Sequence, residues 1–338
     1  MADQIITQTQ AVQQAQYKHK HDLIRPTGLV GVPTGHYDWD LQIGGWQPAT
    51  VTSLAMRSRH GKTATAVQVV ESASKVYNGR RGEVIFFSWE LSPRAFVERY
   101  ICHKVGITMM QYRYPKILPP ETQKRIDEAY MEARRFPVHY HGTSTNIEEV
   151  IKTVDKILLD IKKSPTNPLT KESIEGVAIQ PIVVIDYVTM ATPRPSARYG
   201  SKTYDVADFL QTFKQYANKT GVAGLFLAQV RRDTEGEPEL QHIQDSGAIE
   251  QNSDNVIIGY RPEADLIQEI RDPFSEGKMS SHNKILWRFQ KCRENEPRDV
   301  LGHVDIKYNR FWSRDQKWGE DYVKLYSDEE FWRQQYGL

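Results

Sequence analysis

The sequence predicts an α/β protein whose mostly parallel central sheet is covered by helices on both faces. Two observations lead to this class. Short apolar segments alternate with segments of helical length and pattern between residues 50 and 230. Several of the apolar segments are nearly continuous hydrophobic runs, such as VIFF and IVVI, and such runs are typical of strands buried on both sides.

The individual elements of this pattern are bounded by Gly, Pro and short polar segments. The expected strands cover residues 50–56, 83–89, 136–142, 181–191 and 222–230. The expected helices cover residues 61–78, 92–105, 120–135, 146–163 and 206–221. One of these helices opens at Ser92-Pro93, because Ser caps helices and Pro is favoured in their first turn.

The two ends of the chain differ from this repeating pattern. Residues 5–22 are rich in Gln and Ala and contain no Gly or Pro, which predicts a helix with a thin apolar stripe that needs a surface to dock on. Residues 254–262, 284–293 and 302–312 have strand patterns with little helix between them and suggest antiparallel additions to the sheet edge. We therefore expect a docking helix over 1–26 and one α/β domain over 27–338.

The composition indicates an ordinary globular protein of the cytoplasm. The 44 Lys and Arg residues balance 43 Asp and Glu residues, so any contact with nucleic acid must come from local patches or from backbone amides. Cys102 and Cys292 form no C-x-x-C pattern, which argues against a disulfide framework. No apolar run approaches the length of a membrane span, so no membrane partner is expected.

The stretch SLAMRSRHGKTATA, residues 53–66, contains the end of a phosphate-binding loop, G-x-x-x-x-G-K-[ST], with Met56 in place of the first glycine. It lies between a predicted strand and a predicted helix, where backbone amides bind anions. Lys62 is expected to reach the β and γ phosphates of ATP, and the Thr63 hydroxyl to ligate Mg²⁺. The expected nucleotide-binding residues are Arg57, Ser58, Arg59, His60, Gly61, Lys62, Thr63 and Ala64. A chance G-K-T remains the alternative on the tripeptide alone.

Polar side chains at the ends of three other strands lower the weight of that alternative. Glu90, Asp186 and Gln229 each follow a buried apolar run, and the carboxyl ends of parallel strands form the ligand-binding edge of a sheet. Glu90 could activate a water molecule that attacks the γ phosphate, and Asp186 could hold Mg²⁺. Gln229 could sense the γ phosphate from the neighbouring strand.

Seven segments taken together resemble the C-terminal ATPase domain of DnaB-type replicative helicases. In order, they are TGHYDWD, GGWQPATVTSLAMRSRHGKTA, VIFFSWELS, VVIDYV, LAQVRR, DSGAIEQNSDNVIIGYRP and QKCREN. The resemblance implies a RecA-like P-loop fold with antiparallel C-terminal strands and an N-terminal linker helix that docks on the adjacent protomer. It also accounts for Met56, because this family carries a small apolar residue at that position and an Arg at the position of Arg57.

The resemblance implies roles for further residues. Lys291 and Arg293 match a K-x-R pair that reaches the nucleotide of the neighbouring subunit as an arginine finger. Residues 241–251 resemble a segment that touches single-stranded DNA, and the residues expected to bind DNA there are Gln244, Asp245, Ser246 and Gly247. Arg194, Arg198 and Lys202 follow the Asp186 strand, and they fit DNA contact and an ordinary solvated loop equally well.

The implied function is a hexameric helicase that uses ATP and Mg²⁺ to move 5′ to 3′ on single-stranded DNA at the replication fork. The N-terminal collar domain of the family has no counterpart in the sequence, which suggests a phage or plasmid form acting in a bacterial cell. Primase, a helicase loader and a single-strand binding protein are candidate further partners. Two alternatives stay open: a RecA-like recombinase or repair ATPase that forms filaments, and a nucleotide-binding module without catalysis.

Overall fold

The computed structural model describes residues 7–24, 29–162, 176–192, 202–271, 277–313 and 328–336. The chain divides into two units, of which one comprises residues 1–28 with 321–338 and the other residues 29–320. The first unit contains helices α1 (Gln8–Ile24) and α10 (Glu329–Tyr336). The N-terminal helix expected over 5–22 is therefore present. Within the described ranges, no helix is both long enough and apolar enough to cross a membrane.

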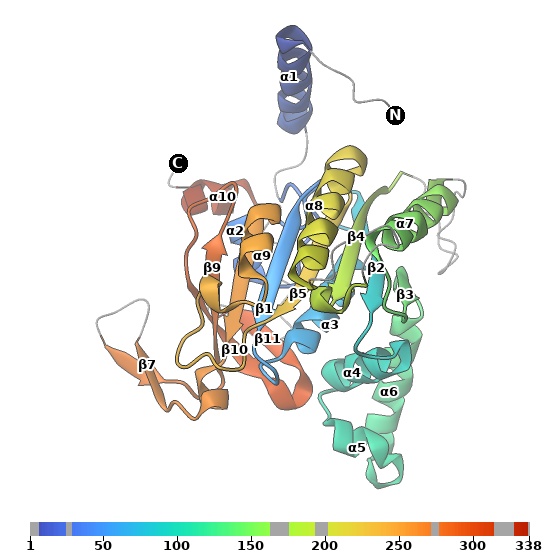
Figure 1. Ribbon diagram of the computed structural model, residues 1–338. Helices are drawn as coiled ribbons and strands as arrows, with labels where there is room; N and C mark the ends of the chain where they lie inside the picture. Colours follow the sequence, from blue (N-terminus) through green and yellow to red (C-terminus); the bar gives the residue numbers. More distant parts are fainter. Residues whose placement is uncertain are drawn as a thin grey trace. The chain divides into compact units, whose positions relative to one another are not determined.

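The second unit is built on a nine-stranded sheet, counted over the described residues, in the order β11-β10-β9-β6-β1-β5-β4-β2-β3 (Figure 1). Its strands are β1 (Val51–Met56), β2 (Arg80–Ser88), β3 (Val138–His141), β4 (Ala178–Asp186), β5 (Ala223–Gln229), β6 (Asn255–Tyr260), β9 (Lys284–Lys291), β10 (Val300–Asp305) and β11 (Arg310–Ser313). Strands β1 to β6 pair in parallel, whereas β9, β10 and β11 are antiparallel. A separate hairpin joins β7 (Glu269–Arg271) to β8 (Lys278–Ser280).

Helices cover both faces of the sheet, as the alternating pattern predicts. One face packs against α2 (Tyr37–Ile43), α3 (Lys62–Ala73), α4 (Pro93–Val105) and α6 (Pro120–Ala133). The other packs against α7 (Ile147–Lys162), α8 (Lys202–Thr220) and α9 (Ser246–Asn252), and Figure 1 shows α8 and α9 in front of the strands. The short helix α5 (Met109–Arg113) precedes α6. The mostly parallel α/β class predicted from the sequence is confirmed.

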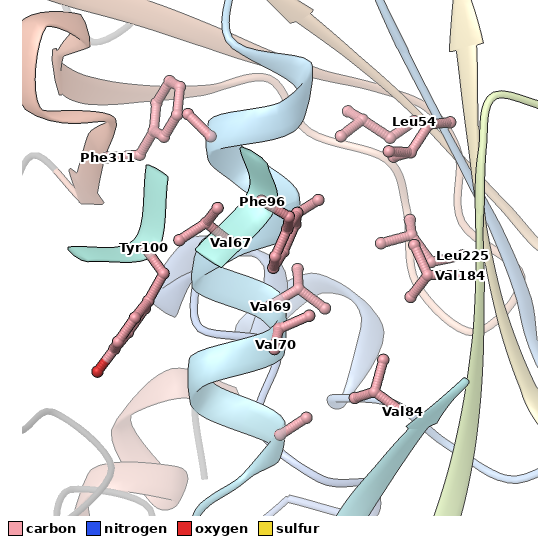
Figure 2. Close-up of a cluster of buried hydrophobic side chains, with 14 of the residues drawn as sticks. Leu54, Val67, Val69, Val70, Val84, Phe96, Tyr100, Val184, Leu225 and Phe311 are labelled. Carbon is pink, nitrogen blue, oxygen red and sulfur yellow. The ribbon is translucent and has the colours of Figure 1, made fainter. Parts of the chain in front are cut away.

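Helix α3 lies at the centre of the larger apolar cluster. Nearly all of its residues are buried, because it packs against the sheet on one side and against α4 and β11 on the other. Figure 2 shows α3 with Leu54, Val184 and Leu225 on its sheet side and with Tyr100 and Phe311 on its opposite side. Burial of each such side chain stabilises the fold by about 1.5–3 kcal/mol. The start of α3 is therefore held firmly in position.

Two expectations about the strands were wrong in detail. The segment at 254–262 was expected as an antiparallel addition, but β6 pairs in parallel with β1 inside the sheet. Helix α9 returns the chain to the amino end of the sheet before β6, and such a crossover produces a parallel strand. The strand expected over 181–191 ends at Asp186, and residues 188–190 form a 3₁₀ turn.

Met56 is buried in the core on the side of the sheet that carries α3. It leaves no accessible side chain, and it packs over Gly259 of the neighbouring strand β6. A Cβ atom on Gly259 would lie 2.7 Å from Met56 Cε and 2.7 Å from Trp287 Cζ3. Gly259 therefore provides the space that the Met56 side chain occupies, and the side chain points away from the phosphate loop and into the core.

Replacing Met56 with Ala should lower the free energy of unfolding by about 2–5 kcal/mol, because it leaves a cavity beside Gly259. The measurement is equilibrium unfolding in urea. Met131→Ala is the matched control, since the Met131 side chain is 54% exposed on α6, and its effect should stay within about 0.5 kcal/mol. Equal effects of the two substitutions would contradict the buried role of Met56.

Candidate functional site

The segment between β1 and α3 is shaped to bind an anion. The loop turns through Arg59 at φ 68° and Gly61 at φ 112°, and α3 begins at Lys62. The first turn of α3 contains no acidic residue, and no side chain caps it. Its first amides therefore have no partner inside the helix and point, with the positive end of the helix dipole, at the space before Lys62. Backbone geometry of this kind binds phosphate groups.

The strand ends bring two carboxylates to the same place. Lys62 Nζ lies 3.3 Å from Asp186 Oδ1 and 3.6 Å from Glu90 Oε2. The same Nζ lies 4.2 Å from the centroid of the Tyr187 ring. Ser88 and Asp186 are in register on β2 and β4, so the two chain segments leave the sheet side by side. The grouping of Lys62, Glu90 and Asp186 predicted from the sequence is therefore present in the structure.

A cavity of about 230 Å³ opens at this edge of the sheet. It is lined by Met56, Arg57, Ser58, Arg59, Gly61, Lys62, Thr63, Ala64, Glu90, Gln229, Ile306 and Asn309. Most of these residues are the ones predicted to bind or act on a nucleotide. Ile306 and Asn309 were not predicted, because they lie some 250 positions from the phosphate loop in sequence and carry no motif.

Asp186 fits a divalent cation. Its side chain is fully buried, and neither carboxylate oxygen accepts a hydrogen bond from a described residue. Burial raises the pKa of Asp186, the positive charge of Lys62 offsets part of that rise, and Glu90 adds to it. A buried carboxylate with unshared oxygens is costly unless a positive charge satisfies it. With the Thr63 hydroxyl on the cavity wall, this is the donor set of a Mg²⁺ site.

His60 and Arg57 bind protein groups in this structure. The His60 ring is buried, its Nδ1 accepts a hydrogen bond from the Arg261 backbone amide at 3.1 Å, and it is not among the cavity-lining residues. The Arg57 guanidinium pairs with Asp265 and donates to two backbone carbonyls in the segment between β5 and α9. These contacts attach the phosphate loop to the segment that follows β6. The sequence had grouped both residues with the nucleotide ligands.

Lys291 and Arg293 lie at the opposite edge of the sheet. Lys291 is paired with Val256 at the amino end of β6, whereas the phosphate loop follows the carboxyl end of β1. Lys291 Nζ donates to the Glu250 carbonyl at 2.6 Å, and Arg293 lies beyond the strand and pairs with Asp254 at 2.6 Å. Neither side chain lines the cavity of its own chain.

The predicted DNA-contacting segment lies beside the cavity edge. The Gln244 amide donates to the Gln229 carbonyl at 3.0 Å, and Asp245 adopts φ 57° immediately before α9. Ser246 and Gly247 line an open groove of about 420 Å³ with Arg288 and Gln290, which sequence analysis had not selected. Their alternate spacing on β9 was the available signal. Arg194 and Arg198 lie outside the described residues, and Lys202 begins α8 with a side chain that is not described.

Comparison with known proteins agrees with this geometry. The family model for the DnaB-like helicase C-terminal domain matches residues 31–312. The chain belongs to this family. Among DnaB-family proteins, it is 26% identical to the replicative DNA helicase DnaB of Geobacillus stearothermophilus, over 86% of this chain and 58% of that protein. It is 25% identical to DnaB of Mycoplasma genitalium, over 78% of this chain and 52% of that protein.

Two solved structures share the fold of this DnaB-like domain. An isolated ATPase domain of a DnaB-like helicase matches with a TM-score of 0.73 at 20% identity, over 90% of this chain and 99% of that chain. A DnaB-like replicative helicase, studied for its interactions with primase, matches with a TM-score of 0.71 at 19% identity, over 88% of this chain and 66% of that chain. The RecA-like fold expected from the resemblance is confirmed. The chain spans about half the length of the curated relatives it matches.

The buried His60 ring should make the protein less stable in acid. Burial lowers the pKa of His60 from 6.5 to about 4, so the unfolded chain binds a proton that the folded protein excludes. The free energy of unfolding should therefore fall as the pH drops from 6.5 to about 4, with a contribution on the order of 2 kcal/mol from this residue.

His60→Asn should reduce this loss, because Asn keeps an acceptor for the Arg261 amide and does not titrate. The measurement is urea unfolding at neutral pH and at about pH 4.5. His36, whose pKa burial lowers to about 3, remains in both proteins and accounts for residual pH dependence. An identical pH dependence in the wild type and the variant would contradict this role of His60.

Proposed function

We propose that this chain is the ATPase motor of a replicative DNA helicase that moves on single-stranded DNA and unwinds duplex during replication. The observation that carries this proposal is the position of Lys62, which lies at an open helix N-terminus between Asp186 and Glu90. Membership in the DnaB-like family favours a helicase over a filament-forming recombinase or a nucleotide-binding module without catalysis. DnaB proteins of two bacteria are named replicative DNA helicases.

The residues divide the reaction among them. The loop amides at 57–64 and Lys62 would hold the phosphates of ATP. Thr63 and Asp186 would hold Mg²⁺, which supplies positive charge next to the phosphates. Glu90 is about half exposed and faces the cavity, where it could orient a water molecule and accept its proton. Gln229 lines the same cavity at the end of β5, where it could respond to the γ phosphate.

Lys291 and Arg293 fit a role in a neighbouring subunit. They lie at the sheet edge opposite the cavity, so a head-to-tail ring would bring them to the next chain's nucleotide. Their positive charge could stabilise the charge that develops on the phosphates. Asp254 accepts hydrogen bonds from the Val51 amide and from Lys214 as well as from Arg293, so its position is fixed. We propose a homohexamer on this basis.

Single-stranded DNA is the proposed partner of the segment at 244–247. The groove shared by Ser246, Gly247 and Arg288 offers backbone amides, a cation and small side chains, which suit a phosphate backbone without base specificity. The Gln244–Gln229 hydrogen bond connects this segment to the nucleotide cavity. Movement 5′ to 3′ and docking of the helix within 1–26 on an adjacent protomer belong to the same proposal.

The remaining partners follow from the same family. One DnaB-like replicative helicase has been solved together with its interactions with primase. Primase, a helicase loader and a single-strand binding protein are candidate partners of this chain. The proposed setting is the cytoplasm of a bacterial cell or of a phage-infected host.

Glu90→Gln should lower the rate of ATP hydrolysis by about 10²–10⁴-fold and keep nucleotide binding, because the amide cannot accept the proton of the attacking water. Lys62→Ala should lose nucleotide binding itself. The measurements are steady-state ATPase assays with and without single-stranded DNA, binding of a fluorescent ADP analogue, and unwinding of a forked duplex. Glu128→Gln, exposed on α6, is the matched control. Unchanged turnover in Glu90→Gln would favour a module that binds nucleotide without catalysis.

A mixture of Lys62→Ala and Arg293→Ala proteins should recover ATPase activity that neither variant shows alone. In a randomly mixed ring, about a quarter of the interfaces would pair an intact Lys62 with an intact Arg293 from the next subunit. The assay compares each variant with the one-to-one mixture, after native mass spectrometry has shown that mixed rings form. Mixed rings without recovered activity would contradict a role for Arg293 in the neighbouring subunit.

A further inference from the structure

One wall of the nucleotide cavity comes from the C-terminal part of the sheet. The 3₁₀ turn η5 (Ile306–Tyr308) joins β10 to β11, and the cavity is lined there by Ile306 and Asn309. This turn packs directly on the phosphate loop. A Cβ atom on Gly61 would lie 3.1 Å from Ile306 Cδ1 and 2.5 Å from Phe311 Cζ. The position of the turn therefore sets the width of the cavity.

The two walls of the cavity differ in chemistry. The wall from the phosphate loop presents Lys62 and unpaired helix amides, and it suits phosphate oxygens. The wall from the turn presents an aliphatic side chain and a neutral amide, which suit a base or sugar through apolar contact and hydrogen bonding. We propose that Ile306 and Asn309 form the nucleoside-binding wall, and that His103 is the positioning residue that holds this wall in place. This inference rests on the proposed nucleotide-binding function.

His103 binds the turn through the backbone of Asn309. Its ring lies on α4 with the residue about 1% exposed, and its Nδ1 lies 2.8 Å from the Asn309 carbonyl oxygen. Its Nε2 lies 3.0 Å from Glu71 Oε2 on α3. A carbonyl and a carboxylate both only accept hydrogen bonds, so the ring donates from both nitrogens and carries a positive charge. Asn309 itself adopts φ 54°, a conformation that Asn tolerates better than most residues.

Charged groups around His103 hold this arrangement. Lys104 Nζ lies 2.9 Å from Glu71 Oε1 and 2.8 Å from Glu132 Oε1. Burial acts to raise the pKa of Glu71, but His103 and Lys104, with a smaller effect of Lys75, hold it well below its usual range. The carboxylate therefore stays ionised and keeps its hydrogen bond with the His103 ring.

Further groups face His103 from other elements. The Arg310 guanidinium donates to the His103 carbonyl at 2.9 Å and to the Lys104 carbonyl at 3.3 Å. Tyr100 stacks near the ring at a centroid distance of 6.4 Å. His36 also lies near enough for the charge of His103 to contribute to lowering its pKa, although burial is the main cause.

A second connection ties the same segment to α3. Gln68 Nε2 donates to the Phe311 carbonyl at 2.9 Å, and the Phe311 amide donates to Gln68 Oε1 at 2.7 Å. This pair fixes β11 against α3, whereas the His103 hydrogen bond is the one that reaches Asn309 at the cavity. Loss of His103 should therefore displace the turn while Gln68 keeps the strand in place.

The test compares ADP with inorganic pyrophosphate, because pyrophosphate uses only the phosphate wall. His103→Ala and Ile306→Ala should each weaken ADP binding about tenfold and leave pyrophosphate binding within about twofold of wild type. In ATPase assays, the KM for ATP should rise about tenfold with kcat within about twofold. Glu132→Gln is the matched control, since it removes a partner of Lys104 without touching Asn309, and both ligands should bind it as they bind the wild type. Thermal melting without ligand shows that each variant folds.

The outcomes separate this inference from the proposed function. Equal weakening of ADP and pyrophosphate in His103→Ala would indicate general damage to the site and would overturn the inference. Unchanged ADP binding in Ile306→Ala would overturn it too, and this second variant decides the matter if His103→Ala does not fold. A wild-type protein that bound neither ligand would overturn the nucleotide site itself and this inference with it.

Discussion

The buried pair of Lys62 and Asp186 constrains everything around it. Both side chains are almost inaccessible to solvent, and two charges taken out of water are tolerated only when each faces an opposite charge. Their contact requires that the start of α3 and the end of β4 meet at one point. It therefore fixes the turn at Gly61, the register of β4 beside β2 and the position of Glu90. An anionic ligand and a cation would satisfy the polar atoms that remain without hydrogen bonds there.

Helix α3 connects this point to the rest of the domain. It presents Lys62 to the cavity at its first residue, the apolar side chains of its middle to the sheet, and Glu71 near its end to His103. A displacement of α3 would therefore move the phosphate wall and the turn at 306–309 together. Because protein cores are closely packed, such a helix transmits displacement with little loss. The two walls of the cavity are in this way tied to one rigid element.

The sheet also separates the functional groups in space. The carboxyl ends of β1, β4 and β5 carry the cavity, whereas Lys291 and Arg293 lie at the amino end of β6. No motion within the packed sheet brings those two groups to the same chain's cavity, since the strand between them is held by pairing on both sides. Under the proposed function, the site is completed only by a second copy of the chain.

The sequence by itself determined the class of the fold and the groups at the phosphate end of the site. Continuous apolar runs, the G-K-T tripeptide and polar residues at strand ends are local patterns, so Lys62, Glu90 and Asp186 could be placed together without coordinates. The parallel pairing of β6, the packing of Met56 over Gly259 and the wall formed by Ile306 and Asn309 were decided only by the tertiary structure. These contacts join residues some 200 or more positions apart and depend on shape and on two hydrogen bonds of one imidazole, which no local pattern in the sequence encodes.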